Sequence, residues 1–273
     1  MDTAITVLDG EATAGLGEIR IHHPPGTFAP TAASLISLRA IGTHSYLLRG
    51  IGIDWGSGTG CLSIAATRIA AVESVFGLDI VPENVRAAAE NAARNGVAGK
   101  VAFIVSDSYA PVSPADRDRL AAVCGRVSFV LANPPASDFG DGFEFRRRVL
   151  KGAGDFLRPG GVVFLSISSQ YGKQRIFQLE RDAPGFAYRS LLASTDWVPF
   201  DLARPDLLEC LRLYASVEET GGQSYAFQSP AGEQSKTIDA RSALRLFEAT
   251  GKSPLSRWQT HLFEYQPQRG RRL

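Results

Sequence analysis

The run Ile53-Asp54-Trp55-Gly56-Ser57-Gly58-Thr59-Gly60 decides the fold, because it joins the end of an apolar strand to a glycine-rich turn. Residues 51–55 are rich in strand formers, and a stretch with helical character begins at Cys61. Glycines between a strand and a helix let the backbone approach a ligand where side chains would block it. The sequence therefore predicts a ligand-binding loop made of these three glycines.

The alternation of short apolar runs and helical stretches continues from residue 50 to residue 167, which is typical of a parallel sheet with helical crossovers. The predicted strands are 51–55, 74–80, 101–106, 127–132, 161–167, 186–193 and 258–265, and the predicted helices in this core are 61–71, 82–95 and 143–157. We predict an α/β, Rossmann-like, doubly wound sheet of seven strands, mostly parallel with an antiparallel C-terminal strand.

Two segments lie outside this pattern. Residues 1–49 contain a predicted strand at 17–22 and a helical stretch at 31–48, and we expect them to cover the cofactor site of the main domain, 50–273. Residues 194–255 form an insertion between the last two strands, with predicted helices at 205–214 and 240–249. If those strands form a hairpin, the insertion leaves from the carboxyl edge of the sheet and overhangs the site as a lid.

The composition is that of a globular domain, and the net charge is too small to attract a polyanion to the protein as a whole. The chain has 273 residues, 44% of them hydrophobic, and a formal net charge of +1. It contains no basic leader followed by an apolar stretch, and no uncharged apolar run of about 18 residues. Three widely spaced cysteines make neither a disulfide framework nor a metal motif. We expect a cytoplasmic protein without a metal site or a membrane partner.

Three carboxylates are predicted to lie on the same edge of the sheet as the glycine loop. Asp54 precedes the loop, Asp79 ends the second strand, and Asp107 ends the third. Ligands of open α/β sheets bind at this edge, where a carboxylate can accept ribose hydroxyls or an adenine amino group. A nicotinamide dehydrogenase is the weakest of the functional hypotheses, because the dinucleotide-binding fingerprint requires a third glycine where this sequence has Cys61.

These residues resemble the class I S-adenosylmethionine-dependent methyltransferases, over roughly residues 50–167. The resemblance implies that 50–273 is a methyltransferase domain and that the cofactor is S-adenosyl-L-methionine. It implies that Gly56, Gly58 and Gly60 pack against the methionyl group, with Asp54 beside them. It further implies that Asp79 holds the ribose and that Asp107 holds the adenine, with Ile80 on the adenine face.

The stretch Ala132-Asn133-Pro134-Pro135-Ala136 follows the fourth core strand. Two prolines fix the backbone and remove N–H donors, which makes the corner rigid and rich in hydrogen-bond acceptors. A planar amide or aryl amine is a poor nucleophile because its lone pair is delocalised. If the Asn133 side-chain oxygen and the Pro134 carbonyl accept its hydrogens, the nitrogen becomes more pyramidal and can attack a methyl group in line.

This corner resembles the Asn-Pro-Pro-aromatic motif of methyltransferases that modify planar nitrogens, and the segments 141–147 and 157–161 look most like the HemK branch. The resemblance implies that Asn133 and Pro134 are catalytic, with Asn133 also beside the cofactor and Pro135 beside the substrate. Position 136 is alanine where the family has an aromatic ring. Either Phe139 substitutes for that ring, or the target is not a flat amide or base.

Two remaining features bear on the substrate. In related enzymes the segment that holds Phe28 and Thr31 often closes over the methionine end of the cofactor, so both are candidate ligand contacts. Arg146, Arg147 and Arg148 fall on a predicted helix where successive side chains diverge, which favours a solvated face over a phosphate track.

The leading hypothesis is an S-adenosylmethionine-dependent N-methyltransferase acting on a planar amide or amino nitrogen, in a protein glutamine or a nucleobase. A second hypothesis is a small-molecule methyltransferase with a closed pocket formed by the insertion. A third is a non-catalytic S-adenosylmethionine-binding subunit. The sequence leaves the methyl acceptor open among protein, nucleic acid and metabolite.

Overall fold

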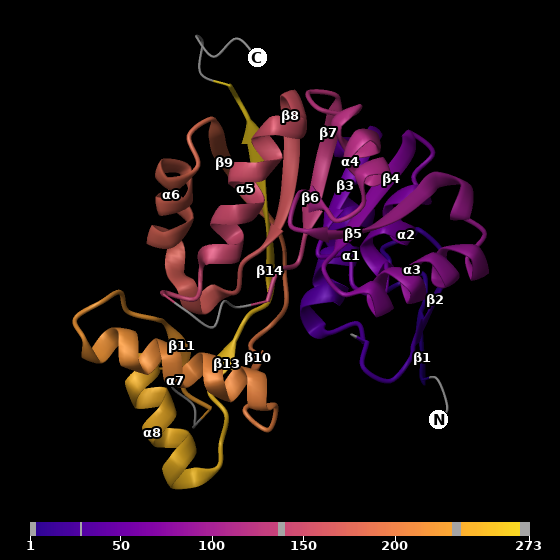
Figure 1. The fold of residues 1–273 in the computed structure, drawn as a ribbon. Helices are drawn as coiled ribbons and strands as arrows, with labels where there is room; N and C mark the ends of the chain where they lie inside the picture. Colours follow the sequence, from indigo (N-terminus) through magenta and orange to yellow (C-terminus); the bar gives the residue numbers. More distant parts are fainter. Residues whose placement is uncertain (1–3, 28, 136–139, 231–235, 268–273) are drawn as a thin grey trace.

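The computed structural model describes residues 4–27, 29–135, 140–230 and 236–267. Its centre is an eight-stranded sheet, shown in Figure 1. In spatial order the strands are β6 (Ala110–Pro111), β5 (Val101–Asp107), β4 (Val72–Asp79), β3 (Gly50–Trp55), β7 (Val127–Ala132), β8 (Leu157–Ser166), β14 (Gln259–Tyr265) and β9 (Phe186–Ser194). The doubly wound α/β prediction is confirmed, and the strand beyond the predicted seven is the two-residue β6 at one edge.

The order of the strands reverses between β3 and β7, both of which pair in parallel. The chain runs outward from β3 through β4 to β5, then returns to β7 on the other side of β3. Strand β14 is antiparallel to both β8 and β9, as expected for the C-terminal strand. The switch point between β3 and β7 lies beside the glycine loop, which is where an open α/β sheet binds its ligand.

Helices cover both faces of the sheet and divide the core into two clusters. One face carries α1 (Ala32–Thr43), α2 (Cys61–Thr67) and α3 (Pro82–Arg94); the other carries α4 (Pro114–Ala121), α5 (Glu144–Phe156) and α6 (Gly172–Asp182). Short 3₁₀ turns span Ser45–Leu47, Ala98–Lys100 and Ser169–Tyr171. Alternate residues of a strand serve opposite clusters: Val130 packs with the second set of helices and Leu131 with the first.

A β-hairpin precedes the sheet, formed by β1 (Ala4–Leu8) and β2 (Ile19–His23). Asn91 of α3 and Asn95, the residue that follows this helix, hold β2 by its backbone. Asn91 accepts from the N–H of His22 and donates to its carbonyl, both over 2.9 Å, and Asn95 pairs with Arg20 in the same way. The hairpin and α1 thus pack beside the glycine loop, on one face of the sheet.

The segment between β9 and β14 folds into a small unit at the carboxyl edge of the parallel strands (Figure 1). It contains α7 (Pro205–Glu219), α8 (Ala240–Thr250) and a four-stranded antiparallel sheet of β10 (Val198–Pro199), β13 (Leu255–Ser256), β11 (Phe227–Gln228) and β12 (Thr237–Ile238). Helix α7 packs into the core through Leu211 and Tyr214, both buried.

Candidate active site

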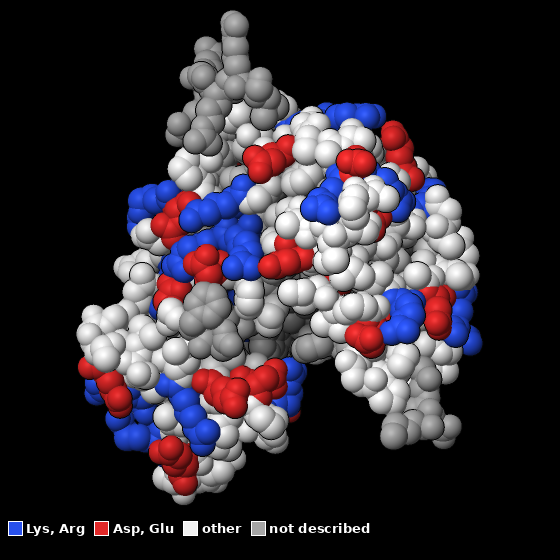
Figure 2. Space-filling view, in the orientation of Figure 1, with Lys and Arg blue, Asp and Glu red and all other residues white. Residues whose placement is uncertain are grey.

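A cavity of about 1030 Å³ opens at the carboxyl ends of the parallel strands. One half is lined by the glycine loop, the ends of β4 and β5 and the start of α1; the other is lined by α5, the residues after β8 and the small unit at 198–214. Figure 2 shows the surface hollowed between the main sheet and that unit. The cavity therefore spans the two parts of the chain that the sequence predicted to face each other.

The glycine loop turns sharply and presents its backbone to the cavity. Gly56, Gly58 and Gly60 have φ values of +69°, +52° and +89°, in the left-handed region that favours glycine. At Gly60 a Cβ would lie 2.9 Å from the ring of Phe103, whereas at Gly56 it would meet nothing within 4 Å. Gly56 and Gly58 line the cavity, while Gly60 packs against the core behind it.

Asp54 is buried under the loop and serves the first turn of α2. Its Oδ2 accepts from the backbone N–H and the hydroxyl of Ser63, over 3.0 and 2.7 Å, while the buried Oδ1 has no hydrogen-bond partner in the described part of the chain. Burial raises the pKa of Asp54 to about 7, although the bonds from Ser63 oppose the shift. Asp54 is absent from the cavity lining, so this structure gives it a contact with the loop's helix rather than with the cavity.

Asp79 ties the glycine loop to the end of β4. Its Oδ2 accepts the backbone N–H of Gly58 over 2.8 Å, and its Oδ1 accepts from Val81 N and Asn84 Nδ2. The carboxylate lines the cavity beside Ile80, whose side chain is 63% exposed. An exposed isoleucine at a cavity wall offers an apolar face to a flat ligand.

Asp107, at the end of β5, also lines the cavity. Its Oδ1 lies 3.5 Å from Arg148 Nη1; the Asp107 side chain is largely exposed and that of Arg148 is half-exposed. The three carboxylates predicted at the strand ends thus occupy one edge, with Asp79 and Asp107 at the cavity and Asp54 behind it.

The Asn-Pro-Pro corner follows β7 directly, with Asn133, Pro134 and Pro135 at the cavity wall. Asn133 Nδ2 donates to Ser34 Oγ over 3.3 Å, and its Oδ1 makes no hydrogen bond to the described residues. Ser34 belongs to the first turn of α1, where Thr31 forms a capping box with it. Thr31 lines the cavity as well. Helix α1 thereby orients the amide so that its oxygen stays available.

Phe28 and Phe139 lie outside the described residues, as does Ala136, so the predicted contacts of these positions stay predictions. The described part of the chain holds no group of three or more histidine, cysteine or acidic side chains that could bind a metal. Among the same residues no helix is long and apolar enough to cross a membrane.

Arg146 is the site residue that sequence reasoning misplaced. Its side chain is 4% exposed, not solvated, and it lines the cavity. Nη2 donates to the Pro134 carbonyl over 3.0 Å, Nη1 to the Pro135 carbonyl over 2.6 Å, and Nε to the Ser166 carbonyl over 3.3 Å. The guanidinium therefore clamps the Asn-Pro-Pro corner to the end of β8.

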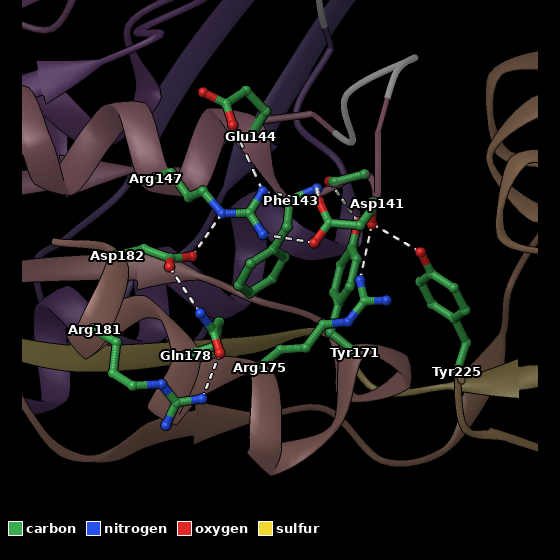
Figure 3. A network of polar contacts seen from close by, with 11 residues as sticks. Asp141, Phe143, Glu144, Arg147, Tyr171, Arg175, Gln178, Arg181, Asp182 and Tyr225 are labelled. Atoms are coloured by element: carbon green, nitrogen blue, oxygen red, sulfur yellow. Dashed lines mark hydrogen bonds and ion pairs between the residues drawn. The ribbon is translucent and has the colours of Figure 1, made fainter. Parts of the chain in front are cut away.

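Arg147 forms the centre of an ionic network on the outer side of α5, shown in Figure 3. It donates to Asp141 over 2.6 and 2.9 Å and to Asp182 over 2.8 Å. The backbone carbonyl of Asp141 in turn accepts from Arg175 and from the Tyr225 hydroxyl, each over 2.8 Å. These bonds fix the start of α5 to α6 and to the inserted unit.

The inserted unit supplies apolar walls and charged groups to the cavity. Its apolar contributions include Phe200, Leu207, Leu213 and Tyr214, and Trp258 adds a ring just before β14. Asp201, Asp206 and Glu209 are exposed at the lip, where Arg204 pairs with Asp206 over 2.6 Å. Acidic side chains border the hollow in Figure 2.

The strand order, the glycine loop and the carboxylates at adjacent strand ends define a Rossmann-like methyltransferase fold of class I. Residues 25–133 match the family model described as Ribosomal protein L11 methyltransferase (PrmA). Among solved structures, the YcgJ protein of Bacillus subtilis has the same fold, with a TM-score of 0.51 and 12% identity over 84% of this chain and 98% of that one. The M. jannaschii tRNA m1G37 methyltransferase gives a TM-score of 0.50 and 16% identity over 70% and 50% of the two chains.

Curated relatives extend the match beyond the family model. A release factor glutamine methyltransferase of Cereibacter sphaeroides is 33% identical over 53% of this chain and 55% of its own length. A ribosomal RNA small subunit methyltransferase C of Alcanivorax borkumensis is 31% identical over 52% and 40%. The chain spans about half the length of the curated relatives it matches. These matches make the chain similar to PrmA-type and HemK-like methyltransferases, and they confirm the HemK-like resemblance that the sequence motifs indicated.

Proposed function

We propose that this protein transfers a methyl group from S-adenosylmethionine to a planar amide or amino nitrogen. The observation that carries the proposal is that Asn133 lines the cavity near the glycine loop while its Oδ1 has no hydrogen-bond partner among the described residues. An acceptor of this kind at a cavity wall is suited to take an N–H from a ligand. The relatives are enzymes of this class that act on release factors and on ribosomal RNA.

The residues around the glycine loop fit this cofactor. Gly56 leaves open space where a Cβ would project, and Asp79 offers carboxylate oxygens that can accept ribose hydroxyls. Ile80 supplies an exposed apolar face for the adenine, and Asp107 an acceptor for its amino group. When bound, S-adenosylmethionine would supply an electrophilic sulfonium methyl group, and the acceptor nitrogen that takes this group in exchange for the sulfur would then release its proton to water.

The Asn-Pro-Pro corner would orient the acceptor. Asn133 Oδ1 accepts one N–H, and the Pro134 carbonyl accepts the other with the lone pair that Arg146 leaves free. Both acceptors are held rigidly, so they act by positioning and by stabilising the charge that develops on the nitrogen. No strong general base is required, because the proton becomes acidic after methyl transfer.

The relatives point to a protein glutamine or a nucleobase as the acceptor. One observation favours a second candidate, a small molecule: residues 198–214 of the inserted unit wall off half of the cavity. In either case we propose that this unit acts as a lid over the acceptor, and that the protein works in the reducing cytoplasm.

The test is to incubate the purified protein with methyl-labelled S-adenosylmethionine and a lysate of its source cells. Protease-sensitive label supports a protein glutamine, nuclease-sensitive label a base amine, and low-mass label a small molecule. Calorimetry with S-adenosylhomocysteine is run beside it. Bound cofactor product with no label in any fraction contradicts catalysis and supports the non-catalytic subunit, whereas an absence of binding contradicts the whole proposal.

A further inference from the structure

The acceptor half of the cavity contains a buried positive charge, and no carboxylate of the described residues forms an ion pair with it. Arg146 is 4% exposed, and in the described chain its polar contacts are the carbonyls of Pro134, Pro135 and Ser166. The guanidinium carbon also lies 5.3 Å from the centre of the Tyr171 ring and 5.9 Å from that of Phe143. Carbonyls and rings stabilise a guanidinium, but they do not neutralise it.

Arg146 keeps hydrogen-bond donors for a ligand. The three carbonyls use one N–H on each nitrogen of the guanidinium, so each terminal nitrogen retains a second N–H. Arg146 lines the cavity, and guanidinium N–H groups are strong donors to a carboxylate. The neighbouring Arg147 differs, because three acidic side chains already surround it.

Gln170 supplies a second, independent donor to the same half of the cavity. Its side chain is 1% exposed and lines the cavity. Its Oε1 accepts from the Ser256 hydroxyl over 2.6 Å, which fixes the amide and leaves Nε2 without a hydrogen-bond partner among the described residues. An amide N–H₂ at a cavity wall is a donor that a ligand can use.

The lip of the cavity disfavours a polyanion. Asp201, Asp206 and Glu209 are exposed there, with Arg204 bound to Asp206, so a phosphate backbone would lie against net negative charge. The repulsion between these acidic groups and a small monoanion is weak, because the groups are solvated and screened by salt. The attraction between the monoanion and Arg146 is stronger, because Arg146 lies in a less polar interior.

We propose that the acceptor is a small planar amine or amide that carries a carboxylate, with its nitrogen at Asn133 and its carboxylate on Arg146 and Gln170. Phe200 and Leu207 would flank the body of the molecule. This inference rests on the proposed N-methyltransferase function and narrows its acceptor to one chemical class.

The test compares two probes of matched shape in the presence of S-adenosylhomocysteine, 4-aminobenzoate and its uncharged analogue 4-aminobenzamide. Calorimetry should give the carboxylate a Kd at least about tenfold lower than that of the amide. In Arg146→Lys and in Gln170→Met this preference should shrink severalfold, while the Kd for S-adenosylhomocysteine stays within about twofold. The control Arg119→Met, an exposed arginine on α4, should keep the preference.

Equal affinity for the two probes, or binding of neither while S-adenosylhomocysteine binds, overturns the proposal and leaves the methyltransferase function standing. A loss of S-adenosylhomocysteine affinity in Arg146→Lys also overturns it, because the arginine would then serve the cofactor. A merely structural role for Arg146 would weaken both probes equally. If the wild-type protein does not bind S-adenosylhomocysteine, the proposed function itself fails.

Discussion

Arg146 Nη2 donates to the carbonyl of Pro134 over 3.0 Å, so a side chain buried in α5 holds the backbone of the corner that we propose to be catalytic. The same guanidinium reaches the next carbonyl, at Pro135. Proline removes the N–H groups that would otherwise tie such a corner to its neighbours. The hydrogen bonds of Arg146 therefore fix the backbone of the corner, and the Oδ1 atom of Asn133 remains available to a ligand.

Asn133→Ala should lower the rate of methyl transfer by about 10²–10³ while S-adenosylmethionine affinity stays within a few fold. The substitution removes the acceptor Oδ1, whereas Asp79 and the glycine loop are untouched. Loss of one positioned hydrogen-bonding group of this kind costs about 10²–10³ in turnover. Single-turnover assays give the rate and calorimetry the affinity. An equal loss of both would show that Asn133 serves cofactor binding instead.

Gly60→Ala and Gly56→Ala should separate folding from cofactor binding. At Gly60 the new methyl group would collide with Phe103 and Ala88, so we expect the free energy of unfolding to fall by about 2–3 kcal/mol. At Gly56 the methyl group meets nothing, so about 1–2 kcal/mol of backbone strain is expected. Because the new methyl group at position 56 projects where the cofactor would lie, the affinity for the cofactor should fall as well.

Urea unfolding and calorimetry on both variants check this pair. The prediction is wrong if Gly56→Ala binds S-adenosylmethionine as tightly as the wild type, since the loop would then not approach the ligand closely.

The sequence predicted the sheet well because its strands are buried apolar runs bounded by turns. Strand β7 begins and ends at the predicted residues, 127 and 132. The strand β1 and the helices α4 and α6 were missed. Strand β1 is largely exposed, and both helices are rich in charged residues, so none shows a long apolar pattern. The two-residue strands of the inserted unit are too short to have a period.

The site was predicted less completely, because burial of a charged side chain depends on tertiary packing. Three consecutive arginines look equivalent in sequence, yet Arg146 is buried, Arg147 is paired and Arg148 is half-exposed. One signal was present: Arg146 continues the buried stripe of Val149, Leu150 and Ala153 at helical spacing. An arginine inside an apolar stripe indicates a buried partner, although the stripe does not identify the Pro134 carbonyl.

Arg147→Met should destabilise the protein and flatten its acid denaturation. Burial alone would raise the pKa of Asp141 and of Asp182, but the hydrogen bonds and charge of Arg147 outweigh burial and hold both below the usual range. A depressed carboxyl pKa contributes stability above the unfolded value, and this is lost as pH falls. Below about pH 4 the wild type should therefore lose stability faster than the variant.

Because these side chains are partly exposed, we expect the substitution to cost about 1 kcal/mol at pH 7. Chemical denaturation from pH 3 to pH 7 measures the difference, with Arg119→Met as a control for an exposed pair. Parallel curves for wild type and Arg147→Met would contradict the assignment of the network.

Asp54→Asn should remove a second pH dependence of the stability, opposite in sign to that of the Arg147 network. Burial raises the pKa of Asp54 to about 7, with a smaller contribution from the charge of Asp79 and opposition from the bonds of Ser63. The folded protein therefore prefers the protonated acid. The contribution of Asp54 to the free energy of unfolding is fully present below the pKa of the carboxyl in the unfolded chain, near 4. It is lost as the pH rises through 7, by up to about 1.4 kcal/mol per pH unit. Asparagine keeps an oxygen that can accept from Ser63 and carries no charge at any pH.

The measurement is the free energy of unfolding of both proteins from pH 4 to pH 8. The wild type should lose stability relative to Asp54→Asn by an amount on the order of a few kcal/mol over that range. If the difference between the two proteins stays constant with pH, Asp54 is ionised in the folded state. Its unpartnered Oδ1 would then need a donor that the described residues do not provide.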